Sequence, residues 1–517
     1  MPLSLIQKKT CKTCGKVAVE KSRINFGTSK WVALECGHMT TEEVIKSFDY
    51  ENFAWQSDGK SNKLMPYQIE GIKFLEKANA RALLADEQGL GKTIQAGALL
   101  SIHAEQLSPF LIVTKSKIVT QWLHEMLALS NKKLAIQIIT SGKMKAMDAF
   151  DGWIISYDLL KNEDIFEDIQ PKTIILDECQ AIKNHLADRA KAVQKIASKA
   201  EHILGLSGTP IKNNAGEYFT ILNLLQPSRF PQYQRFIDYY CDHYESGFYQ
   251  KIGGLRDPEG FRRRTEDFVI RRTKAEVLPD LPQLTRKFFH CEMDGKLKKT
   301  YDRLWDDFSK KFYEEDSAGS AAQIAIMTAM REITGVAKVE TCIDFVTEFL
   351  LSTDRKIVIF AHHHKAVTLL ELQLNSWLAD GGFNKCIMMR AGDDAGVRVK
   401  EFRDNPNSRV MIASTLSAGE GLNLQFCSDA VMLERQWNPA NEEQAEARFH
   451  RFGQLNPVSV NYMICSQTID EYFTQLVEQK RAIVASALDG KVMEWNENSL
   501  MKELAIILAT TGKKWSL

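Results

Sequence analysis

Short apolar runs alternate with stretches of helical periodicity along most of this 517-residue chain. The first set of runs comprises ALLA (82–85), FLIVT (110–114), WIISY (153–157), TIILDE (173–178) and HILGLSGT (202–209). The second set comprises KIVIFA (356–361), KCIMMR (385–390), RVMIAS (409–414) and DAVMLE (429–434). Such alternation is typical of parallel sheets wrapped by helices, so the sequence predicts an α/β fold with two parallel-sheet modules. Helical periodicity from about 215 to 330 predicts a helical insert between them.

Length and charge limit the classes of protein that fit. A chain of this length is too long for one core and predicts three or four domains or subdomains. Lys+Arg and Asp+Glu both number 66, so overall charge favours no polyanionic partner, and any nucleic-acid surface must be a local patch. No apolar run reaches about 18 residues, and the N-terminus lacks a secretory signal pattern, so we expect no membrane span.

The cysteines form a scattered group and an N-terminal cluster. Seven of the ten stand singly, which favours a reducing, intracellular environment. The others form Cys11-x2-Cys14 and, after a gap, Cys36-x-His38. Cys11, Cys14, Cys36 and His38 together match the ligand types of a structural Zn²⁺ site, so we expect a small zinc-binding module. Three free thiols and a surface histidine are the alternative.

A glycine-rich stretch, LLADEQGLGKTIQ, follows the first apolar run and precedes a helical pattern. Strand, glycine-rich turn and helix in this order are the context of a phosphate-binding loop. Gly89 and Gly91 let backbone amides curl around an anion at the start of the helix. Lys92 is expected to reach the β- and γ-phosphates of ATP, and Thr93 to bind Mg²⁺. Asp86 stands where the usual pattern has its first glycine, and a turn that binds no phosphate is the alternative.

The run TIILDE ends in two adjacent carboxylates, Asp177 and Glu178. At the end of a strand, Asp177 can hold Mg²⁺, and Glu178 can polarise the water that attacks a phosphoryl group. Solvated acids at a strand end are the alternative for this pair alone. The combination with the glycine-rich loop favours nucleotide hydrolysis.

A third element, NEEQAEARFHRFGQ, lies far along the chain. Gln444, Arg448 and Arg451 are spaced i, i+4, i+7, so one helix would place them on one face. Two arginines aimed together suit stabilisation of charge on a transferred phosphoryl group. The alternatives are salt bridges with the glutamates of the same stretch and a capping box between Asn441 and Gln444.

These stretches resemble the motifs of the Snf2 group of superfamily 2 helicase-type motors, which are ATP-dependent translocases on double-stranded DNA. The resemblance covers roughly residues 64–485, in the family order. The stretches resembling the glutamine motif and motifs I, Ia, Ib and II are LMPYQIEG (64–71), LADEQGLGKTIQ (84–95), LIVTKSKIVTQWLHE (111–125), IISYDLL (154–160) and ILDECQAIKN (175–184). Those resembling motif III, its following signature and motifs IV, V and VI are LGLSGTPIKNNAGEYFTILNLLQP (204–227), FVIRRTKAEVLPDLP (268–282), IVIFAHHHKAV (357–367), STLSAGEGLNLQ (414–425) and QAEARFHRFGQ (444–454). The family itself carries Asp at the position of Asp86. REITGVAKVE (331–340) and FAHHHK (360–365) resemble the compact annealing-helicase branch.

The resemblance implies two RecA-like lobes with ATP and Mg²⁺ in the cleft between them. Gln68 would contact adenine, while Gly421, Arg448 and Arg451 of the second lobe would face the nucleotide. Backbone phosphates of DNA would be held by Lys115, Ser116, Ser156, Ser414, Thr415, Arg271 and Arg272. The last two belong to a basic stretch, FRRRTEDFVIRRTK, for which a solvated helix face is the alternative.

One position departs from the family pattern. Motif II of the family usually ends in histidine, whereas this chain has Cys179 and Gln180 after the carboxylates. Gln180 therefore bears on the coupling between the ATP site and motif III at Ser207, Gly208 and Thr209. Since an amide can replace the hydrogen bond of an imidazole, we expect an active motor.

These inferences predict the following division of the chain: a zinc-binding module (1–45), a linker (46–63), a first lobe (64–228), helical insertions and a lobe connector (229–335), a second lobe (336–485) and a C-terminal helical extension (486–517). In the extension, the apolar run LAIILA (504–509) is expected to pack as a helix against the second lobe.

The function expected from these features is that of a monomeric DNA-dependent ATPase that translocates on duplex or branched DNA in fork remodelling, branch migration or repair. The N-terminal module would bind DNA junctions or a protein partner. Compactness and the lack of nuclear-localisation tracts predict the cytoplasm of a bacterium or phage-infected cell. The alternatives are a motor that displaces a DNA-bound protein such as RNA polymerase, and a nucleotide-gated DNA-binding scaffold.

Overall fold

The computed structural model divides the chain into two compact units, Met1–Met65 and Pro66–Leu517. The residues that it describes are 8–10, 17–26, 29–34, 39–43, 48–57, 60–130, 134–208, 215–246, 249–314, 319–390, 393–414, 422–437, 439–487 and 497–511. Among these residues, no helix has the length and apolar character needed to cross a membrane.

The first unit consists of two small antiparallel sheets. The larger sheet has the order β1-β2-β3-β4, formed by Lys8–Thr10, Val17–Phe26, Ser29–Leu34 and Met39–Glu43. The other pairs β5 (Ala54–Ser57) with β6 (Lys60–Lys63). The end of the predicted linker is therefore a hairpin, in keeping with the Asp-Gly sequence between its strands. Cys11, Cys14, Cys36 and His38 lie outside the described residues, so the zinc site stays a prediction.

The first lobe of the second unit contains a seven-stranded sheet in the order β15-β7-β12-β11-β8-β10-β9, in which every pair is parallel. Its strands are β7 (Arg81–Leu84), β8 (Phe110–Thr114), β9 (Ile136–Ile139), β10 (Gly152–Ser156), β11 (Thr173–Asp177), β12 (His202–Leu206) and β15 (Val269–Ile270). The five apolar runs of the first set are strands, as predicted.

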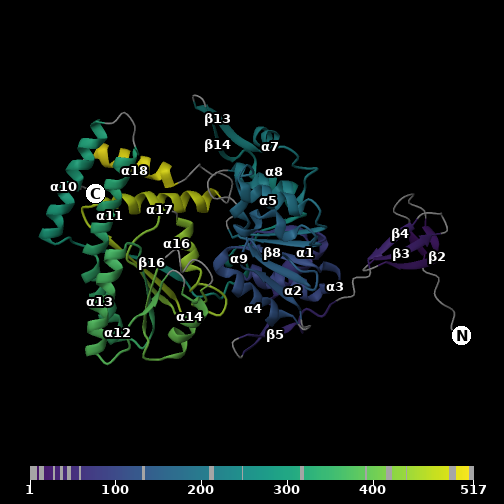
Figure 1. Cartoon of the computed structure of the whole chain (residues 1–517), viewed down its shortest axis with the longest axis horizontal. Coiled ribbons are helices and arrows are strands. Elements are labelled where there is room, and N and C mark those ends of the chain that lie inside the picture. The colour runs from purple at the N-terminus through teal and green to yellow at the C-terminus, as the bar shows by residue number, and fades with distance from the viewer. Residues whose placement is uncertain are drawn as a thin grey trace. The chain divides into compact units, whose positions relative to one another are not determined.

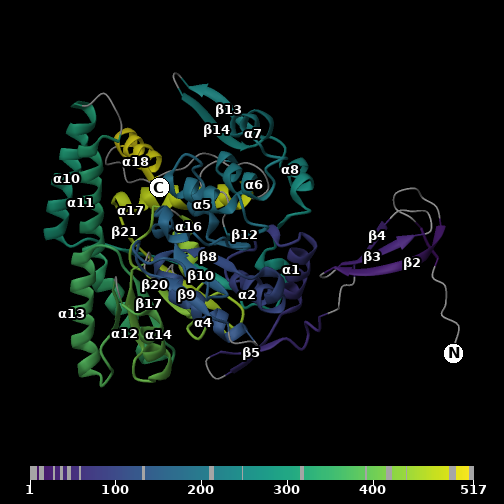
Figure 2. The same ribbon diagram turned by 45° about the vertical axis from the view of Figure 1, so that its right-hand side comes forward.

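Both faces of this sheet are buried because successive side chains of a strand point to opposite sides. Val113, Ile155 and Leu176 pack with α5 (Asp188–Ala197) and α6 (Phe219–Leu225). The intervening residues are buried as well, on the side of α1 (Pro66–Lys77), α2 (Lys92–Ile102), α3 (Ala104–Leu107) and α4 (Val119–Leu129). Figures 1 and 2 show this lobe as blue and teal ribbons.

The segment between the lobes is not the uniform helical insert that the sequence predicted. Helices α7 (Tyr233–Tyr240) and α8 (Pro258–Thr265) flank a hairpin of β13 (Cys241–Ser246) and β14 (Tyr249–Leu255). Phe236, Cys241 and Phe261 belong to the core of the first lobe. The segment also supplies an edge strand to each lobe, β15 to the first and β16 to the second. Its apolar side chains pack on sheets formed by distant residues, which local periodicity does not report.

The second lobe has a six-stranded parallel sheet in the order β16-β21-β20-β17-β19-β18. Its strands are β16 (Leu284–Cys291), β17 (Ile357–Phe360), β18 (Ile387–Met389), β19 (Val410–Ala413), β20 (Asp429–Met432) and β21 (Val458–Cys465). Ile357 and Ile359 face α12 (Val339–Ser352) and α13 (His364–Asp380), which lie side by side in Figures 1 and 2. Val358 and Phe360 face the core shared with α14 (Ala395–Asp404) and α16 (Pro439–Glu446).

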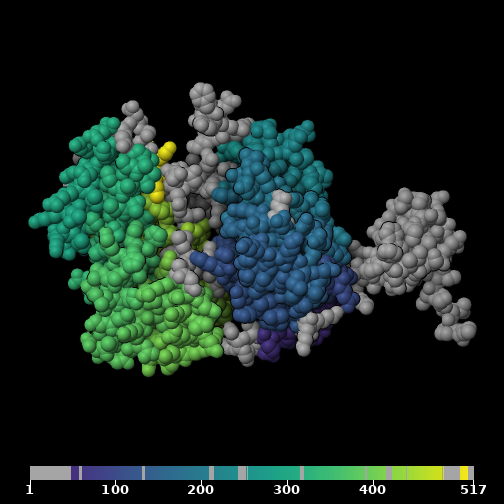
Figure 3. Space-filling model, viewed as in Figure 1, coloured from purple at the N-terminus to yellow at the C-terminus, as the bar shows by residue number. Residues whose placement is uncertain are grey.

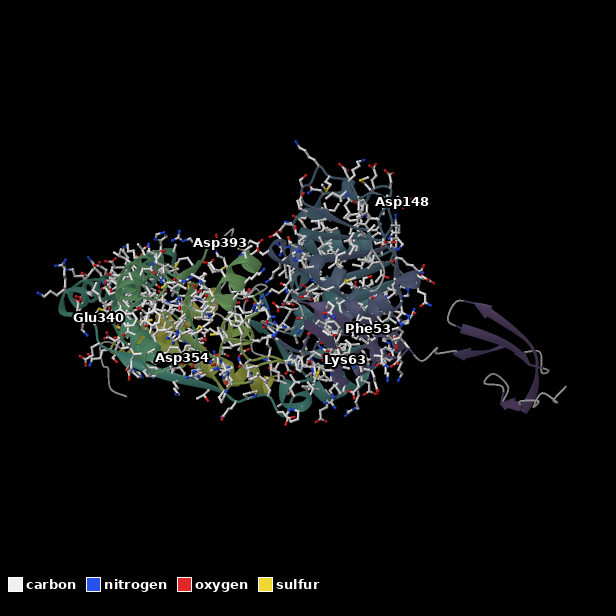
Figure 4. The ribbon with its side chains drawn as sticks, turned by 90° about the horizontal axis from the view of Figure 1, so that it is seen from below. Phe53, Lys63, Asp148, Glu340, Asp354 and Asp393 are labelled. Atoms are coloured by element: carbon white, nitrogen blue, oxygen red, sulfur yellow. The ribbon has the colours of Figure 1, made fainter. Side chains whose placement is uncertain are left out.

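Four further helices share a core beside this sheet: α10 (Gly295–Glu314), α11 (Ala321–Ala337), α17 (Ile469–Ala487) and α18 (Glu497–Thr511). Leu504, Ala505 and Leu508 of α18 pack against this cluster, which confirms that LAIILA is helical and packs on the second lobe. Figure 3 shows the residues of α10 to α14 forming a continuous surface on one side of the lobe. Asp148 of the first lobe and Asp354 of the second, labelled in Figure 4, are exposed.

Candidate nucleotide site

The candidate site lies at the carboxyl ends of neighbouring strands in the first lobe. β7 leads into the glycine-rich loop, β12 into Ser207, β11 ends at Asp177, and β8 ends at Thr114. These strands are neighbours in the order β7-β12-β11-β8, so residues from four distant stretches meet at one edge of the sheet. Ligands of open α/β sheets bind at this edge.

The glycine-rich loop has the backbone that a phosphate-binding turn requires. Gly89 and Gly91 have φ of 91° and 71°, in the left-handed region, and α2 starts at Lys92. A Cβ on Gly91 would lie 2.6 Å from Nε2 of Gln68, so a side chain has no room there. This arrangement confirms the strand–turn–helix context on which the prediction rested. Thr93 occupies the first turn of α2, where it could bind a metal ion.

Lys92 folds back over its own loop. Its Nζ donates to the carbonyl oxygens of Asp86 at 2.7 Å and Glu87 at 3.2 Å. Burial lowers the pKa of Lys92, whereas the carboxylates of Glu178, Asp86 and Asp177 act in the opposite direction. The ammonium therefore stands in a buried site surrounded by acidic groups, ready to exchange carbonyl oxygens for phosphate oxygens.

Asp86 is the centre of a buried network that anchors the loop. Its carboxylate accepts from Arg272 Nη2 at 2.5 Å and Nε at 3.0 Å, and from Gln95 Nε2 at 3.1 Å. Arg272 also donates to Gln95 Oε1 at 3.0 Å and to the carbonyl oxygen of Tyr67. The position that lacks the usual glycine therefore holds an acid that ties the glutamine motif, the loop and the segment after β15 together.

Two basic residues for which the sequence predicts DNA contacts lie in this network or beside it. Arg272 is paired within the protein, and Arg271 Nη1 donates to the carbonyl oxygens of Ala85 at 3.1 Å and Gly208 at 3.5 Å. Both side chains are thus directed towards the nucleotide loop instead of an open surface, which does not support the predicted DNA contacts. The three arginines of α8 are exposed, as their alternative interpretation requires.

Asp177 is held in place by the helix after β8. Its Oδ2 accepts from Trp122 Nε1 and Thr114 Oγ1, both at 2.8 Å. Burial and the neighbouring Glu178 raise the pKa of Asp177, and these two hydrogen bonds oppose the shift. Because both bonds go to Oδ2, Oδ1 remains as an oxygen donor of the type that Mg²⁺ prefers. The carboxylate of Asp177 and the hydroxyl of Thr93 therefore fit a magnesium ion chemically.

Glu178, Gln180 and Ser207 form a continuous hydrogen-bonded chain. Gln180 Nε2 donates to Glu178 Oε2, and Ser207 Oγ donates to Gln180 Oε1 at 2.6 Å. Glu178 has φ 49° and ψ 50°, a left-handed conformation that is uncommon outside glycine and tends to occur at functional sites. The amide therefore spans the distance between motifs II and III, as expected for a replacement of the family's histidine.

Motif VI differs from its predicted geometry. Helix α16 runs from Pro439 to Glu446, so Arg448 and Arg451 lie in the turns that follow it. The prediction of one helical face carrying both arginines is wrong, and the helix starts too early for Asn441 to be its N-cap. The carbonyl oxygen of Arg448 accepts from the backbone of Leu424 at 3.2 Å, which ties the turn after α16 to the segment before β20.

The glutamates of α16 are paired with other parts of the second lobe. Glu442 accepts from Arg435 and Arg481, each at 2.7 Å, in a buried network. Glu446 accepts from Arg286 at 2.6 Å. Salt bridges along the helix therefore do not account for these two glutamates, which instead fix the helix that leads to motif VI.

Motif VI borders the phosphate-binding loop. A Cβ built on Gly89 would lie 3.2 Å from Cβ of Arg451 and 3.6 Å from the carbonyl oxygen of Ala447. Burial lowers the pKa of Arg451, and Glu125 and Tyr67 act in the opposite direction. The structure thus brings the arginine-bearing turn of the second lobe to the glycine-rich loop of the first, although Gln444 stands one turn of helix earlier.

The remaining predicted residues occupy varied positions. Gln68 is buried against the loop, with Nε2 3.5 Å from the carbonyl oxygen of Leu90. Lys115 and Ser116 follow β8, and Ser116 is exposed at the start of a short 3-10 helix. Ser156 is buried and its Oγ accepts from the backbone of Leu159, which makes direct DNA contact unfavourable. Ser414 is half-buried after β19, while Thr415 and Gly421 lie outside the described residues.

Two residues of the stretch QWLHE contribute to the site although the sequence predicts no role for them. Trp122 holds the predicted metal ligand Asp177, and burial raises the pKa of Glu125 while the hydrogen bond from Gln121 and the charge of Arg451 oppose the shift. The spacing of Trp122 and Glu125 on a helix directly after a strand places them on one side, a signal that could have been used.

The fold and the site define a two-lobed phosphate-loop protein of helicase type. Residues 67–342 match the SNF2-related domain, and residues 337–453 match the helicase conserved C-terminal domain. The chain belongs to the SNF2-related family.

Among characterised relatives, the chain is similar to the DNA annealing helicase and endonuclease ZRANB3 of Homo sapiens, at 27% identity over 83% of this chain and 41% of the relative. It is also similar to the SWI/SNF-related matrix-associated actin-dependent regulator of chromatin subfamily A-like protein 1 homolog of Caenorhabditis elegans, at 28% identity over 81% of this chain and 61% of the relative. The chain thus spans between two fifths and three fifths of these relatives. The Sulfolobus solfataricus SWI2/SNF2 ATPase core in complex with dsDNA aligns with a TM-score of 0.40 and 21% identity, over 88% of this chain and 98% of that one.

Proposed function

We propose that this chain is a DNA-stimulated ATPase that converts ATP hydrolysis into movement along duplex or branched DNA. The observation that carries the proposal is the meeting of Arg451 from the second lobe with the Gly89 turn of the first. A γ-phosphate bound at this turn would be contacted from both lobes, so its hydrolysis would alter the contact between them.

Each group of the site has a definite part in this reaction. Lys92 exchanges its bonds to loop carbonyls for bonds to the β- and γ-phosphates, and Gln68 contacts the adenine. Mg²⁺, held by Thr93 and Asp177, would neutralise charge on the phosphates. Glu178 orients and polarises the attacking water, while Arg448 and Arg451 stabilise charge on the transferred phosphoryl group.

Gln180 would couple the nucleotide site to the part of the lobe that is proposed to contact DNA. A change in the hydrogen bond between Glu178 and Gln180 would be felt at Ser207 in motif III, because the same amide binds both. Phosphates of DNA would be contacted from Lys115 and Ser116 in the first lobe and from Ser414 and Thr415 in the second, independently of sequence. Relatives named DNA annealing helicase support DNA as the substrate, and we propose that forked or branched DNA is the form on which the motor acts.

The decisive experiment measures ATP hydrolysis without DNA and with single-stranded, duplex and forked DNA. Stimulation by duplex or forked DNA, and its loss in Lys92→Ala and Glu178→Gln, is expected. A rate that does not respond to any DNA would contradict translocation. Displacement of a triplex-forming strand without duplex unwinding would separate a translocase from a strand-separating helicase.

Further parts of the proposal concern the setting of the motor. Seven cysteines in the described part of the chain are free and buried, which supports a reducing compartment such as the cytoplasm. We place the motor there as a monomer, in a bacterium or phage-infected cell. The N-terminal unit would bind zinc through Cys11, Cys14, Cys36 and His38, and would contact DNA junctions or a protein partner. Elemental analysis of the purified protein beside Cys11→Ser tests the metal, with one zinc per chain expected only in the former.

A further inference from the structure

Asp177, the predicted metal ligand, is fixed by hydrogen bonds from three neighbouring segments of the first lobe. Its Oδ2 accepts from Thr114 Oγ1 and from Trp122 Nε1, each at 2.8 Å. Its carbonyl oxygen accepts from the hydroxyl of Tyr157, directly after β10, also at 2.8 Å. The backbone of Asp177 is therefore held by Tyr157, whereas the orientation of the carboxylate depends on Thr114 and Trp122.

The two donors to Oδ2 stand on either side of a short turn, residues 115–118, which we call the motif Ia turn. Thr114 is the last residue of β8, and Trp122 lies in the first turn of α4. Both donors are buried, whereas Ser116 and Lys117 between them are exposed. Because the residues that flank the motif Ia turn bind one carboxylate oxygen, a displacement of the turn relative to β11 would alter at least one of these two bonds.

The motif Ia turn thus has different chemistry on its two sides. On the outer side, the hydroxyl of Ser116 and the ammonium of Lys117 are groups that bind backbone phosphates of nucleic acids. On the inner side, the two bonds to Oδ2 leave Oδ1 of Asp177 as an oxygen donor for Mg²⁺. Hydrogen bonds to a metal-binding carboxylate orient it and raise its affinity for the metal. The turn therefore connects a surface suited to DNA with the proposed metal ligand.

We propose that Thr114 and Trp122 are positioning residues that couple DNA bound at the motif Ia turn to the affinity of Asp177 for Mg²⁺. Both bonds to Oδ2 are formed in the structure, and phosphates bound on the outer side of the turn would stabilise the arrangement in which they are formed. DNA would thereby strengthen binding of the metal, and the metal would strengthen binding of DNA by the same factor. This inference rests on the proposed function, since it assumes that the chain binds DNA and ATP with Mg²⁺.

Two substitutions remove one donor each and keep much of the packing. Thr114→Val removes the hydroxyl at nearly constant shape, and Trp122→Phe removes the N–H but keeps an aromatic ring. Calorimetry on the full chain measures the affinity for the non-hydrolysable analogue AMP-PNP in Mg²⁺ and in EDTA, and the ratio of the two affinities is the contribution of the metal. We expect this ratio to fall about tenfold in each variant, while the affinity in EDTA changes by less than about twofold. Thr114→Ser, which keeps the hydroxyl, should retain the ratio of wild type.

Trp153→Phe is the matched control for lost packing. Trp153 is buried in the same lobe, and its Nε1 has no hydrogen-bond partner among the described residues. Its replacement should lower the melting temperature about as much as Trp122→Phe does, because both variants leave a cavity of similar size. The contribution of Mg²⁺ to AMP-PNP binding should stay at the wild-type value in Trp153→Phe.

The coupling itself is tested by repeating the calorimetry with saturating duplex DNA. In wild type, DNA should raise the contribution of Mg²⁺ about fivefold, at the lower end of the range for coupled sites. In Thr114→Val and Trp122→Phe, the same DNA should change it by less than about twofold, because one of the two bonds to the carboxylate is missing.

The possible outcomes separate this inference from the proposed function. A wild-type contribution of Mg²⁺ in both Thr114→Val and Trp122→Phe would overturn the inference, and so would an equal loss in Trp153→Phe. A DNA-stimulated ATPase in which duplex DNA leaves the contribution of Mg²⁺ unchanged would contradict only this inference. A wild type whose ATP hydrolysis responds to no DNA would contradict the proposed function.

Discussion

The two sides of the candidate nucleotide site are held in contrasting ways. On the loop side, Asp86 has its carboxylate satisfied by Arg272 and Gln95, so the phosphate-binding turn is rigidly anchored. On the motif VI side, Nε of Arg451 is buried and has no hydrogen-bond partner among the described residues. The carboxylate on the loop side therefore has all its partners within the protein. The arginine on the motif VI side still has an N–H group that can bind a ligand. Substitutions on the motif VI side should therefore lower the rate of hydrolysis, whereas substitutions on the loop side should lower the stability of the fold.

The largest effect is expected for Arg451→Ala. If the guanidinium stabilises the transferred phosphoryl group, the kcat of DNA-stimulated ATP hydrolysis should fall by about 10³-fold, within the range for arginines of this role. The melting temperature should stay near that of wild type because part of the side chain is unpaired. Arg451→Lys, which retains charge without the planar fork, is the matched comparison. A large fall in melting temperature with normal kcat would show that Arg451 stabilises the fold and does not act in hydrolysis.

Arg272→Met should show the opposite pattern. Removing one partner of the buried pair leaves Asp86 uncompensated, so the free energy of unfolding should fall by about 3 kcal/mol. Chemical denaturation measures this change, and ATP binding should weaken together with stability. Arg263→Ala, at an exposed surface pair, is the control and should change stability by less than about 0.5 kcal/mol. Unchanged stability in Arg272→Met would show that the loop does not depend on this anchor.

Gln180 connects Glu178 of motif II with Ser207 of motif III on the loop side of the site. Gln180→Ala removes the bonds to Glu178 and Ser207, so DNA-stimulated kcat should fall by about tenfold to a hundredfold, in line with the loss of one or two charge-assisted hydrogen bonds. Gln180→His restores the family residue and should retain activity. The measurement is the ratio of rates with and without duplex DNA. Full stimulation in Gln180→Ala would remove this amide from the coupling route.

The smallest effect is expected on the pH dependence of stability and concerns Glu443. This glutamate shares Arg481 with Glu442 on the same helix. Burial raises the pKa of Glu443 to about 7, while Arg481, 3.6 Å away, acts in the opposite direction. The folded chain keeps the proton longer than the unfolded chain does, so stability declines as pH rises from about 4.5 to 7. Glu443→Gln should be more stable than wild type at pH 8, by no more than about 1 kcal/mol because the side chain is 34% exposed, and equal to it at pH 4.5. A constant difference at both values would contradict this titration.

The extent of sequence-based prediction differs between elements. All nine apolar runs form strands. They could be recognised because strands buried on both faces have nearly continuous apolar sequences. Of the thirteen strands in the two parallel sheets, four were missed for physical reasons. β15 has only two residues, β16 alternates exposed and half-buried positions at the sheet edge, β9 is a short edge strand, and β21 includes Asn461, whose amide is satisfied by the carbonyl of Ala430.

The sequence predicted those parts of the candidate site whose residues lie within one short stretch directly after a strand. The glycine turn, Lys92 and the carboxylates of motif II lie where strand ends must converge, so short stretches were sufficient. The buried pairing of Arg272 was not predicted because its partner Asp86 is 186 positions away, and a run of basic residues does not reveal which of them are paired. The helical face predicted for Arg451 is wrong because α16 ends at Glu446, and the turn that follows it is bound to Leu424 of another motif.

The pairing of β16 with β21 sets an order for assembly of the second lobe during synthesis. β16 is the first strand of that lobe to leave the ribosome, yet it pairs only with the last, with Leu284 opposite Val458. At about 5 to 20 residues per second, this strand waits on the order of ten seconds or more for its partner, while the first lobe is already complete up to β15. Its exposed edge carries Arg286 and Lys287, charges that discourage pairing with other chains in the interval. The charges that interrupt the apolar pattern of this strand would thereby disfavour aggregation of the nascent chain.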